Sequence, residues 1–242
     1  MSNKDPAKLA VLIDADNASS SVIKELLEEV TKFGVATIKR AYGDWTTQNL
    51  VRWKDQLHRY AIQPMQQFAY TKGKNSTDSA FIIDAMDILY AGHVDGFCIV
   101  SSDSDFTRLA TRLREAGKVV YGFGERKTPE SFIAACDKFV FLEVLRKVDN
   151  QNASATVEDL PNLKDLLSHA INETSHDDGW AKLSAVGYFI SKNNTSFDPR
   201  NYGFTKLSTL VRQQGYLECK EVPDSAGIVN HLHVKIRNNL HR

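Results

Sequence analysis

Residues 99–106 read IVSSDSDF, an apolar stretch that leads into two serines and two closely spaced aspartates. Aspartate is depleted from the interior of strands, so Asp103 and Asp105 are expected just beyond the end of one. Their carboxylates repel each other unless something positive lies between them. We therefore interpret this segment as one half of a site that holds a cation.

Two further stretches place aspartates in comparable positions. The apolar run 9–13 ends at Asp14, with Asp16 two residues later, and Asp78 follows the segment KGKNST. Taken singly, an aspartate after a strand is as often a helix N-cap, and Asp78 also suits the positive end of a helix dipole. Two strand ends that each carry an Asp-x-Asp pattern favour a shared carboxylate cluster.

A cluster of carboxylates without histidine or cysteine offers only hard oxygen ligands. Such a site suits Mg²⁺ or Mn²⁺ rather than zinc, and the cation cancels the repulsion between the ligands. An acidic Mg²⁺ or Mn²⁺ site polarises a phosphoryl oxygen and activates water for attack on a phosphodiester. The predicted metal ligands and catalytic residues are Asp14, Asp78, Asp103 and Asp105.

The first 146 residues alternate between strand-like and helix-like patterns. Such alternation predicts βαβ units and an α/β sandwich with a mainly parallel central sheet. Both carboxyl ends that carry aspartates then meet at one edge of the sheet. Strands are predicted at 9–13, 35–41, 61–69, 96–100, 118–123 and 138–144, and helices at 19–32, 46–59, 76–91, 105–116 and after Pro129.

A polar stretch at 149–158 with almost no large apolar residues reads as a linker. Beyond it, three helical patterns precede two alternating segments, which is typical of a small winged helix-turn-helix domain. The helices are predicted at 159–174, 179–192 and 199–214, and the strands near 216–221 and 228–236.

Composition narrows the class of protein. The formal net charge is +0, so the chain is not a polycation that coats nucleic acid indiscriminately. Three dispersed cysteines argue against a disulfide framework and against a cysteine-rich zinc site. The first residues are too polar for a signal peptide and no apolar run spans a membrane. We expect a soluble, cytoplasmic protein without a membrane partner, and a homo-oligomer stays open.

Three motifs in this order resemble the NYN domain of the PIN-like nuclease superfamily. They are IDADN at 13–17, KGKNSTDSAFIIDAM at 72–86 and SSDSDFTRL at 101–109. The resemblance covers 8–146 and implies a PIN-like fold and a metal-dependent ribonuclease with RNA as its substrate.

Residue by residue, the resemblance places Asp14 at the first strand end and Asn17 just after it. Asp78 takes the acidic position that opens the middle helix, and Asp103 and Asp105 take the final pair. The spacing in KGKNSTD is longer than usual, which weakens the placement of Asp78. Asp16 and Asp84 lie within matching stretches but rank lower. Asp84 is six residues past Asp78, and helical rotation carries it away from the face of Asp78. The expected substrate-binding residues of this half are Asn17, Lys72 and Lys74.

The segment 160–237 resembles a LOTUS (OST-HTH) domain, with 147–159 as the linker. The resemblance rests on GWAKLSAVGYFI at 179–190, FDPRNYGFTKLSTLV at 197–211 and IVNHLHVKI at 228–236. It implies a winged helix that binds RNA. The basic side chains expected to contact phosphates are Arg200, Lys206 and Arg212, although a solvated surface would look the same.

Three other readings stay open. A haloacid-dehalogenase-like phosphatase also begins with a strand and Asp-x-Asp, and would use Asp14 as nucleophile. A glycosyltransferase could use Asp103 and Asp105 but leaves Asp14 unexplained. A non-catalytic RNA-binding adaptor would have lost the nuclease activity, against which the intact acidic set argues.

Overall fold

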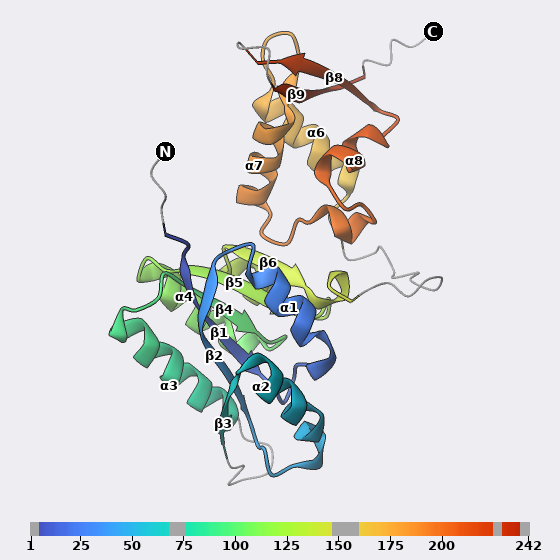
Figure 1. Cartoon of the computed structure of the whole chain (residues 1–242). Coiled ribbons are helices and arrows are strands. Elements are labelled where there is room, and N and C mark those ends of the chain that lie inside the picture. Colours follow the sequence, from blue (N-terminus) through green and yellow to red (C-terminus); the bar gives the residue numbers. More distant parts are fainter. Residues whose placement is uncertain (1–4, 68–75, 147–159, 225–228, 238–242) are drawn as a thin grey trace. The chain divides into compact units, whose positions relative to one another are not determined.

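The computed structural model describes residues 5–67, 76–146, 160–224 and 229–237 (Figure 1). The chain divides into two compact units, Met1–Lys147 and Val148–Arg242, and each has a hydrophobic core of its own. The linker predicted at 147–159 lies outside the described residues.

The first unit is built on a six-stranded sheet in the order β3-β2-β1-β4-β5-β6. All neighbouring strands in it are parallel, which confirms the predicted α/β fold with a mainly parallel central sheet. The central strands read as continuous apolar runs because helices cover both faces of the sheet. The strands are β1 (Lys8–Asp14), β2 (Val35–Gly43), β3 (Gln63–Gln66), β4 (Gly96–Val100), β5 (Val119–Gly124) and β6 (Lys138–Phe141).

Helices α1 (Ile23–Val30) and α2 (Lys54–Tyr60) pack on one face of the sheet (Figure 1). The other face carries α3 (Ser76–Ala91), α4 (Thr107–Glu115) and α5 (Glu130–Ala135). Successive side chains of β1 pack on opposite faces of the sheet, because the side chains of a strand alternate in direction. None of the described helices is both long and apolar enough to cross a membrane.

Several predicted elements of this unit differ in detail from the structure. The strand expected over 138–144 ends at Phe141 and continues as the 3₁₀ helix Leu142–Val144. The helices expected over 19–32 and 105–116 begin with the 3₁₀ helices Ser20–Val22 and Ser104–Phe106. The helix expected over 46–59 begins as a 3₁₀ helix, Gln48–Trp53, and becomes α-helical only in α2. The strand expected over 61–69 is the short β3, which lies at the sheet edge. An edge strand accommodates Pro64, because proline has no N–H to donate to a second neighbour.

In its described residues, 160–224 and 229–237, the second unit contains three α-helices and a small antiparallel sheet in the order β7-β9-β8. The predicted hairpin is present as β8 and β9, whereas the two-residue β7 was not predicted. The helix expected over 199–214 is divided, because Gly203 adopts a left-handed φ of 83° after the 3₁₀ turn Pro199–Tyr202. The elements are α6 (Leu163–Thr174), β7 (Ala181–Lys182), α7 (Leu183–Asn193), α8 (Leu207–Arg212), β8 (Leu217–Pro223) and β9 (Asn230–Ile236).

Candidate functional site

The strand order places the candidate site at the switch point of the sheet. Strand β1 lies between β2 and β4, and the chain leaves β1 in one direction along the sheet and returns to β4 on the other side. Ligands of open parallel sheets bind at the carboxyl ends of the strands at such a switch. Asp14 is the last residue of β1, and the loop 101–105 directly follows β4.

Asp14 is almost completely buried, with 1% of its surface exposed. Its carboxylate accepts hydrogen bonds from the backbone N–H of Asn17 at 3.3 Å and from the Asn17 side-chain amide at 2.8 Å. The hydroxyl of Ser101 donates to the same carboxylate at 2.8 Å, and the Ser101 oxygen accepts from the backbone N–H of Asp103 at 3.1 Å. Ser101 therefore connects the end of β1 to the acidic loop after β4.

The acidic loop is held by its own N-cap. Asp103 caps the 3₁₀ turn Ser104–Phe106, and its Oδ1 accepts from the backbone N–H of Asp105 at 2.9 Å. Gly124, at the end of β5, permits the close approach of this loop, because a Cβ at that position would lie 2.6 Å from the Ser101 carbonyl oxygen. The backbone thus fixes Asp103 before any ligand is bound.

Aromatic packing brings the middle helix to this loop. Phe81 lies one turn after Asp78 on α3, and Phe106 follows Asp105 directly. Both rings are fully buried and their centroids are 4.5 Å apart. Burial of the two rings against each other therefore brings the two carboxylates toward the same place.

Asp78, Asp103 and Asp105 form an acidic triplet, in which one carboxylate oxygen of each residue lies within 4.8 Å of the others. Asp78 and Asp103 are half-buried and Asp105 is exposed. Asp14 is not a member of this triplet, but its charge acts on Asp78 from nearby. These four aspartates are the predicted set, and oxygen-only ligands at this spacing suit a hard divalent cation.

The electrostatics of the site reflect this crowding of carboxylates. The pKa of Asp78 rises from 3.8 to about 6, chiefly because the carboxyl is partly buried and then because Asp14, Asp103, Asp105 and Asp16 repel its charged form. Burial also raises the pKa of Asp14, while the hydrogen bonds from Asn17 and Ser101 act in the opposite direction. A cation at the triplet would relieve the repulsion.

This pKa predicts how cation binding depends on pH. Below about pH 6 a cation must displace a proton from Asp78, so the Mn²⁺ affinity of the chain should fall by up to about tenfold per pH unit. Calorimetric titration with Mn²⁺ at pH 5, 6 and 7 measures this slope. Asp78→Asn should bind more weakly but with a flatter pH dependence, and an equally steep slope in that variant would contradict the assignment.

The raised pKa of Asp78 also makes the stability of the fold depend on pH. Because the folded-state pKa of Asp78 lies above its ordinary 3.8, the folded chain binds this proton more tightly than the unfolded chain does. The contribution of Asp78 to the free energy of unfolding is therefore largest below pH 3.8 and is lost as pH rises to about 6.

Asp84 forms a separate network on the same helix. The Arg40 guanidinium donates to one of its carboxylate oxygens and the Tyr42 hydroxyl donates to the other. Burial and then the contact with Asp84 raise the pKa of Tyr42, so the phenol stays a donor. Arg40 and Tyr42 lie on β2, so the network fixes α3, and with it Asp78, against the sheet. The expectation that Asp84 turns away from Asp78 agrees with this placement.

Replacing Asp84 by Asn should therefore destabilise the fold and lower activity without removing a metal ligand. The expected loss in the free energy of unfolding is about 2 kcal/mol, below the 3–5 kcal/mol typical of fully buried pairs because this one is partly exposed. Urea unfolding measures it, with Asp87→Asn on the exposed side of α3 as control. Equal stability of the two variants would contradict the role given to Asp84.

The other residues predicted for this half of the chain are placed as follows. Asn17 is exposed, but its side-chain amide nitrogen is directed to Asp14, so its predicted contact with substrate would have to use its remaining oxygen. Lys72 and Lys74 lie outside the described residues.

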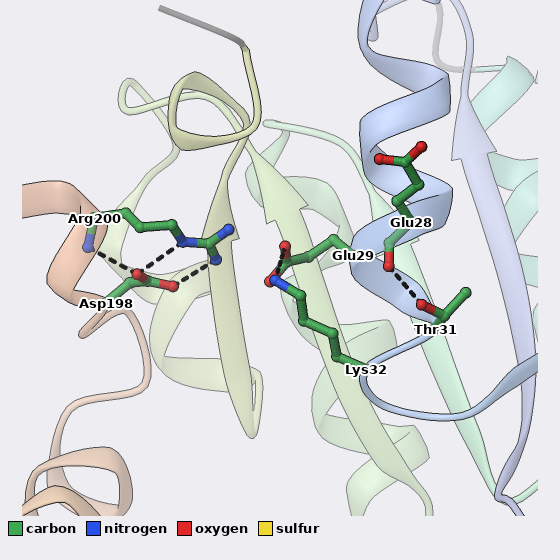
Figure 2. Close-up of polar contacts among 6 residues, drawn as sticks. All are labelled: Glu28, Glu29, Thr31, Lys32, Asp198 and Arg200. Atoms are coloured by element: carbon green, nitrogen blue, oxygen red, sulfur yellow. Dashed lines mark hydrogen bonds and ion pairs between the residues drawn. The ribbon is translucent and has the colours of Figure 1, made fainter. Parts of the chain in front are cut away.

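The basic residues predicted for the second unit differ from one another in their surroundings. Figure 2 shows the Arg200 side chain bound by both carboxylate oxygens of Asp198, at 2.9 and 2.6 Å. Arg212 pairs with Glu221 at 2.7 Å. Lys206 is exposed at the start of α8. Arg200 and Arg212 therefore already have anionic partners, whereas Lys206 faces a pocket.

Ser101 and the Arg40–Asp84–Tyr42 network were not predicted from the sequence. The paired serines before the Asp-x-Asp pattern are the only local signal for Ser101, because a hydroxyl at a strand end can cap the following turn. Arg40 and Tyr42 alternate along β2, which places them on one face, but nothing local indicates their partner on α3.

Comparison with known proteins agrees with this architecture. The sequence matches the model of the NYN domain over residues 8–143 and that of the OST-HTH/LOTUS domain over residues 158–229, which confirms the predicted pair of domains. No protein of curated function matches the chain significantly.

Among solved structures, the chain is similar to a protein of unknown function from Vibrio parahaemolyticus, with 21% identity over 57% of this chain and 94% of that one and a TM-score of 0.48. A protein from Chromobacterium violaceum is 35% identical over 34% of this chain and 88% of its own, with a TM-score of 0.29. An uncharacterized protein from Nitrosomonas europaea is 28% identical over 40% of this chain and 94% of its own, with a TM-score of 0.31.

The NYN match covers more than half of the chain, and it includes both strand ends and the helix that carry the acidic residues. A parallel sheet with carboxylates at its switch point and a C-terminal LOTUS domain fit an RNA-related nuclease. The chain belongs to the NYN domain family.

Proposed function

We propose that this chain is a divalent-metal-dependent ribonuclease that hydrolyses RNA phosphodiesters at Asp14, Asp78, Asp103 and Asp105. The observation that carries the proposal is the acidic triplet, whose carboxylate oxygens lie within 4.8 Å of one another at the carboxyl edge of the sheet. The membership of the chain in the NYN family supports nuclease chemistry at that edge.

The donor set fits Mg²⁺ or Mn²⁺, because it consists of carboxylates alone and these ions prefer oxygen ligands. When bound, such a cation would polarise a phosphoryl oxygen and lower the pKa of a water molecule that attacks phosphorus. Asp78, Asp103 and Asp105 would hold it, and Asp14 would add negative charge from the buried side.

The remaining residues of the site orient these ligands. Ser101 fixes the position of the Asp103 backbone relative to Asp14, and Asn17 donates further hydrogen bonds to the Asp14 carboxylate. Hydrogen-bonded partners of this kind hold ligands in the geometry that a metal requires. Asp78 must lose its proton before it can act as a ligand.

The position of Asp14 argues against the phosphatase alternative. A nucleophilic aspartate needs an accessible carboxylate oxygen, but Asp14 is 1% exposed and both of its oxygens accept hydrogen bonds. Only a measurement of RNA cleavage distinguishes the proposed nuclease from a non-catalytic RNA-binding adaptor.

In this proposal, residues 8–146 form the nuclease domain and residues 160–237 recruit RNA. The chain would act in the cytoplasm, since its three cysteines are free and a reducing compartment keeps them so.

The test is cleavage of a 5′-labelled single-stranded RNA by the purified full chain. We expect cleavage with Mn²⁺ or Mg²⁺, none in EDTA, and recovery when excess Mn²⁺ is added back. Undiminished cleavage in EDTA would exclude the proposed chemistry, and binding without cleavage under every metal condition would favour the adaptor.

A further inference from the structure

A pocket of about 400 Å³ opens on the second unit, where the first turns of α7 and α8 meet β9. Its volume lies in the range of ligand-binding sites. The polar side chains that line it are all able to donate hydrogen bonds, and none is a carboxylate. They are Lys182, Ser184, Lys206, Ser208, Asn230 and His231.

Close packing of two helices forms the base of this donor-lined pocket. Gly187 of α7 and Leu207 of α8 both line it, and a Cβ at Gly187 would lie 3.0 Å from Leu207 Cδ2. Glycine at this position therefore lets the two helices approach closely. Strand β7 pairs Lys182 with His233 of β9, which fixes the Lys182 backbone at the edge of the pocket.

Lys182 and Lys206 differ from most basic residues of this unit. Within the described residues, no hydrogen bond, ion pair or ring contact engages the side chain of either. Two positive charges that line one concave site without a counter-ion favour an anion there. The basic side chains already engaged are Lys164 on Tyr216, Lys192 on Tyr188, Arg200 with Asp198, Arg212 with Glu221, Lys220 on Trp180 and Lys235 with the Asp178 carbonyl.

We infer that this donor-lined pocket binds phosphate groups of single-stranded RNA and is the site through which the second unit recruits substrate. The inference rests on the proposed function, in which that unit binds RNA. Lysine ammonium groups supply compact point charges for phosphate, and serine and asparagine donors add directed hydrogen bonds. This assigns recruitment to Lys182 and Lys206 rather than to Arg200 and Arg212, whose charges are already paired.

The test measures binding of a fluorescein-labelled single-stranded RNA to the full chain by anisotropy, in EDTA and at several KCl concentrations. The double variant Lys182→Gln/Lys206→Gln is compared with Lys164→Gln/Lys192→Gln, which removes the same charge elsewhere on this unit. We expect the pocket variant to bind at least about 10-fold more weakly. The slope of log K against log[KCl] should become shallower by about 1.4, because each phosphate that a lysine neutralises on a single strand contributes about 0.7.

Lys182→Arg/Lys206→Arg should restore most of the affinity, which separates loss of charge from misfolding. The inference would be overturned if the pocket and control variants had equal RNA affinity and equal salt dependence. It would also be overturned if polyglutamate displaced the RNA at a matched charge concentration, because that result would indicate an acidic protein partner. The metal-dependent cleavage assay on the wild-type chain is a separate readout, because failure of the pocket inference would leave that cleavage in place. Failure of the nuclease proposal would abolish cleavage in the wild type instead.

Discussion

Asp103→Asn should lower Mn²⁺-dependent RNA cleavage by about 1,000-fold or more. Loss of one ligand misplaces the cation, which would stabilise the transition state by several kcal/mol. Each ~1.4 kcal/mol of lost stabilisation lowers the rate by a factor of ten. Asn retains a carbonyl oxygen that can accept from the Asp105 backbone N–H, so the N-cap and the loop should persist. The loss should therefore appear in kcat while the unfolding temperature changes little.

The measurement is single-turnover cleavage at saturating RNA and Mn²⁺, with Asp55→Asn, on the exposed surface of α2, as control. Near-wild-type turnover by Asp103→Asn would refute its role as a ligand.

Asp105→Asn should be milder, with a loss of cleavage rate of about 10- to 100-fold if Asp105 acts through a bound water. Equal losses for the two variants would place Asp105 directly on the metal.

Asp14→Asn should be as damaging as Asp103→Asn, but it gives a less direct test. Both oxygens of Asp14 accept hydrogen bonds, so the amide nitrogen of an asparagine would face a donor from Asn17 or Ser101. A buried mismatch of this kind costs about 1–3 kcal/mol in stability. Its loss of activity is interpretable only when measured well below the unfolding temperature of the variant.

The parts of the site that follow from strand order could be predicted from the sequence. Two apolar runs that end in aspartate must meet at one edge of a sheet if their strands are parallel and adjacent. Strands β1 and β4 are neighbours in the sheet and run parallel. The middle helix joins them through Phe81 and Phe106, whose burial is expected from their types even though their mutual contact is not.

The remaining contacts depend on tertiary register, which no local pattern encodes. Asp84 meets Arg40 across 44 positions of the chain, and its partner is settled only by how α3 lies on β2. Arg212 was expected to be available for phosphate, because no local pattern indicates its partner. That partner, Glu221, is nine residues away in the sequence, on a strand that folds back beside Arg212. Sequence alone therefore located the acidic residues better than the basic ones, whose availability depends on which carboxylates the fold brings to them.

Removal of the second unit should raise the KM for RNA by at least about 10-fold, while kcat at saturating RNA should stay within about twofold. The reason is that a linked binding module acts by raising the local concentration of substrate at the nuclease. A chain ending at Lys147 keeps every strand of the parallel sheet, and the core cluster that packs α1 and α2 on it contains no residue beyond Leu145. The acidic triplet also lies wholly within the first unit. The chemistry should therefore survive truncation.

The test compares kcat and KM for the full and truncated chains at two salt concentrations. The KM advantage of the full chain should shrink at the higher salt, because lysine and arginine contacts to phosphate release counterions. If Lys182 and Lys206 are the recruiting residues, their double variant in the full chain should reproduce most of the KM increase. A collapse of kcat with KM unchanged would instead mean that the second unit completes the active site. Recruitment through a linked domain would then be the wrong description of this protein.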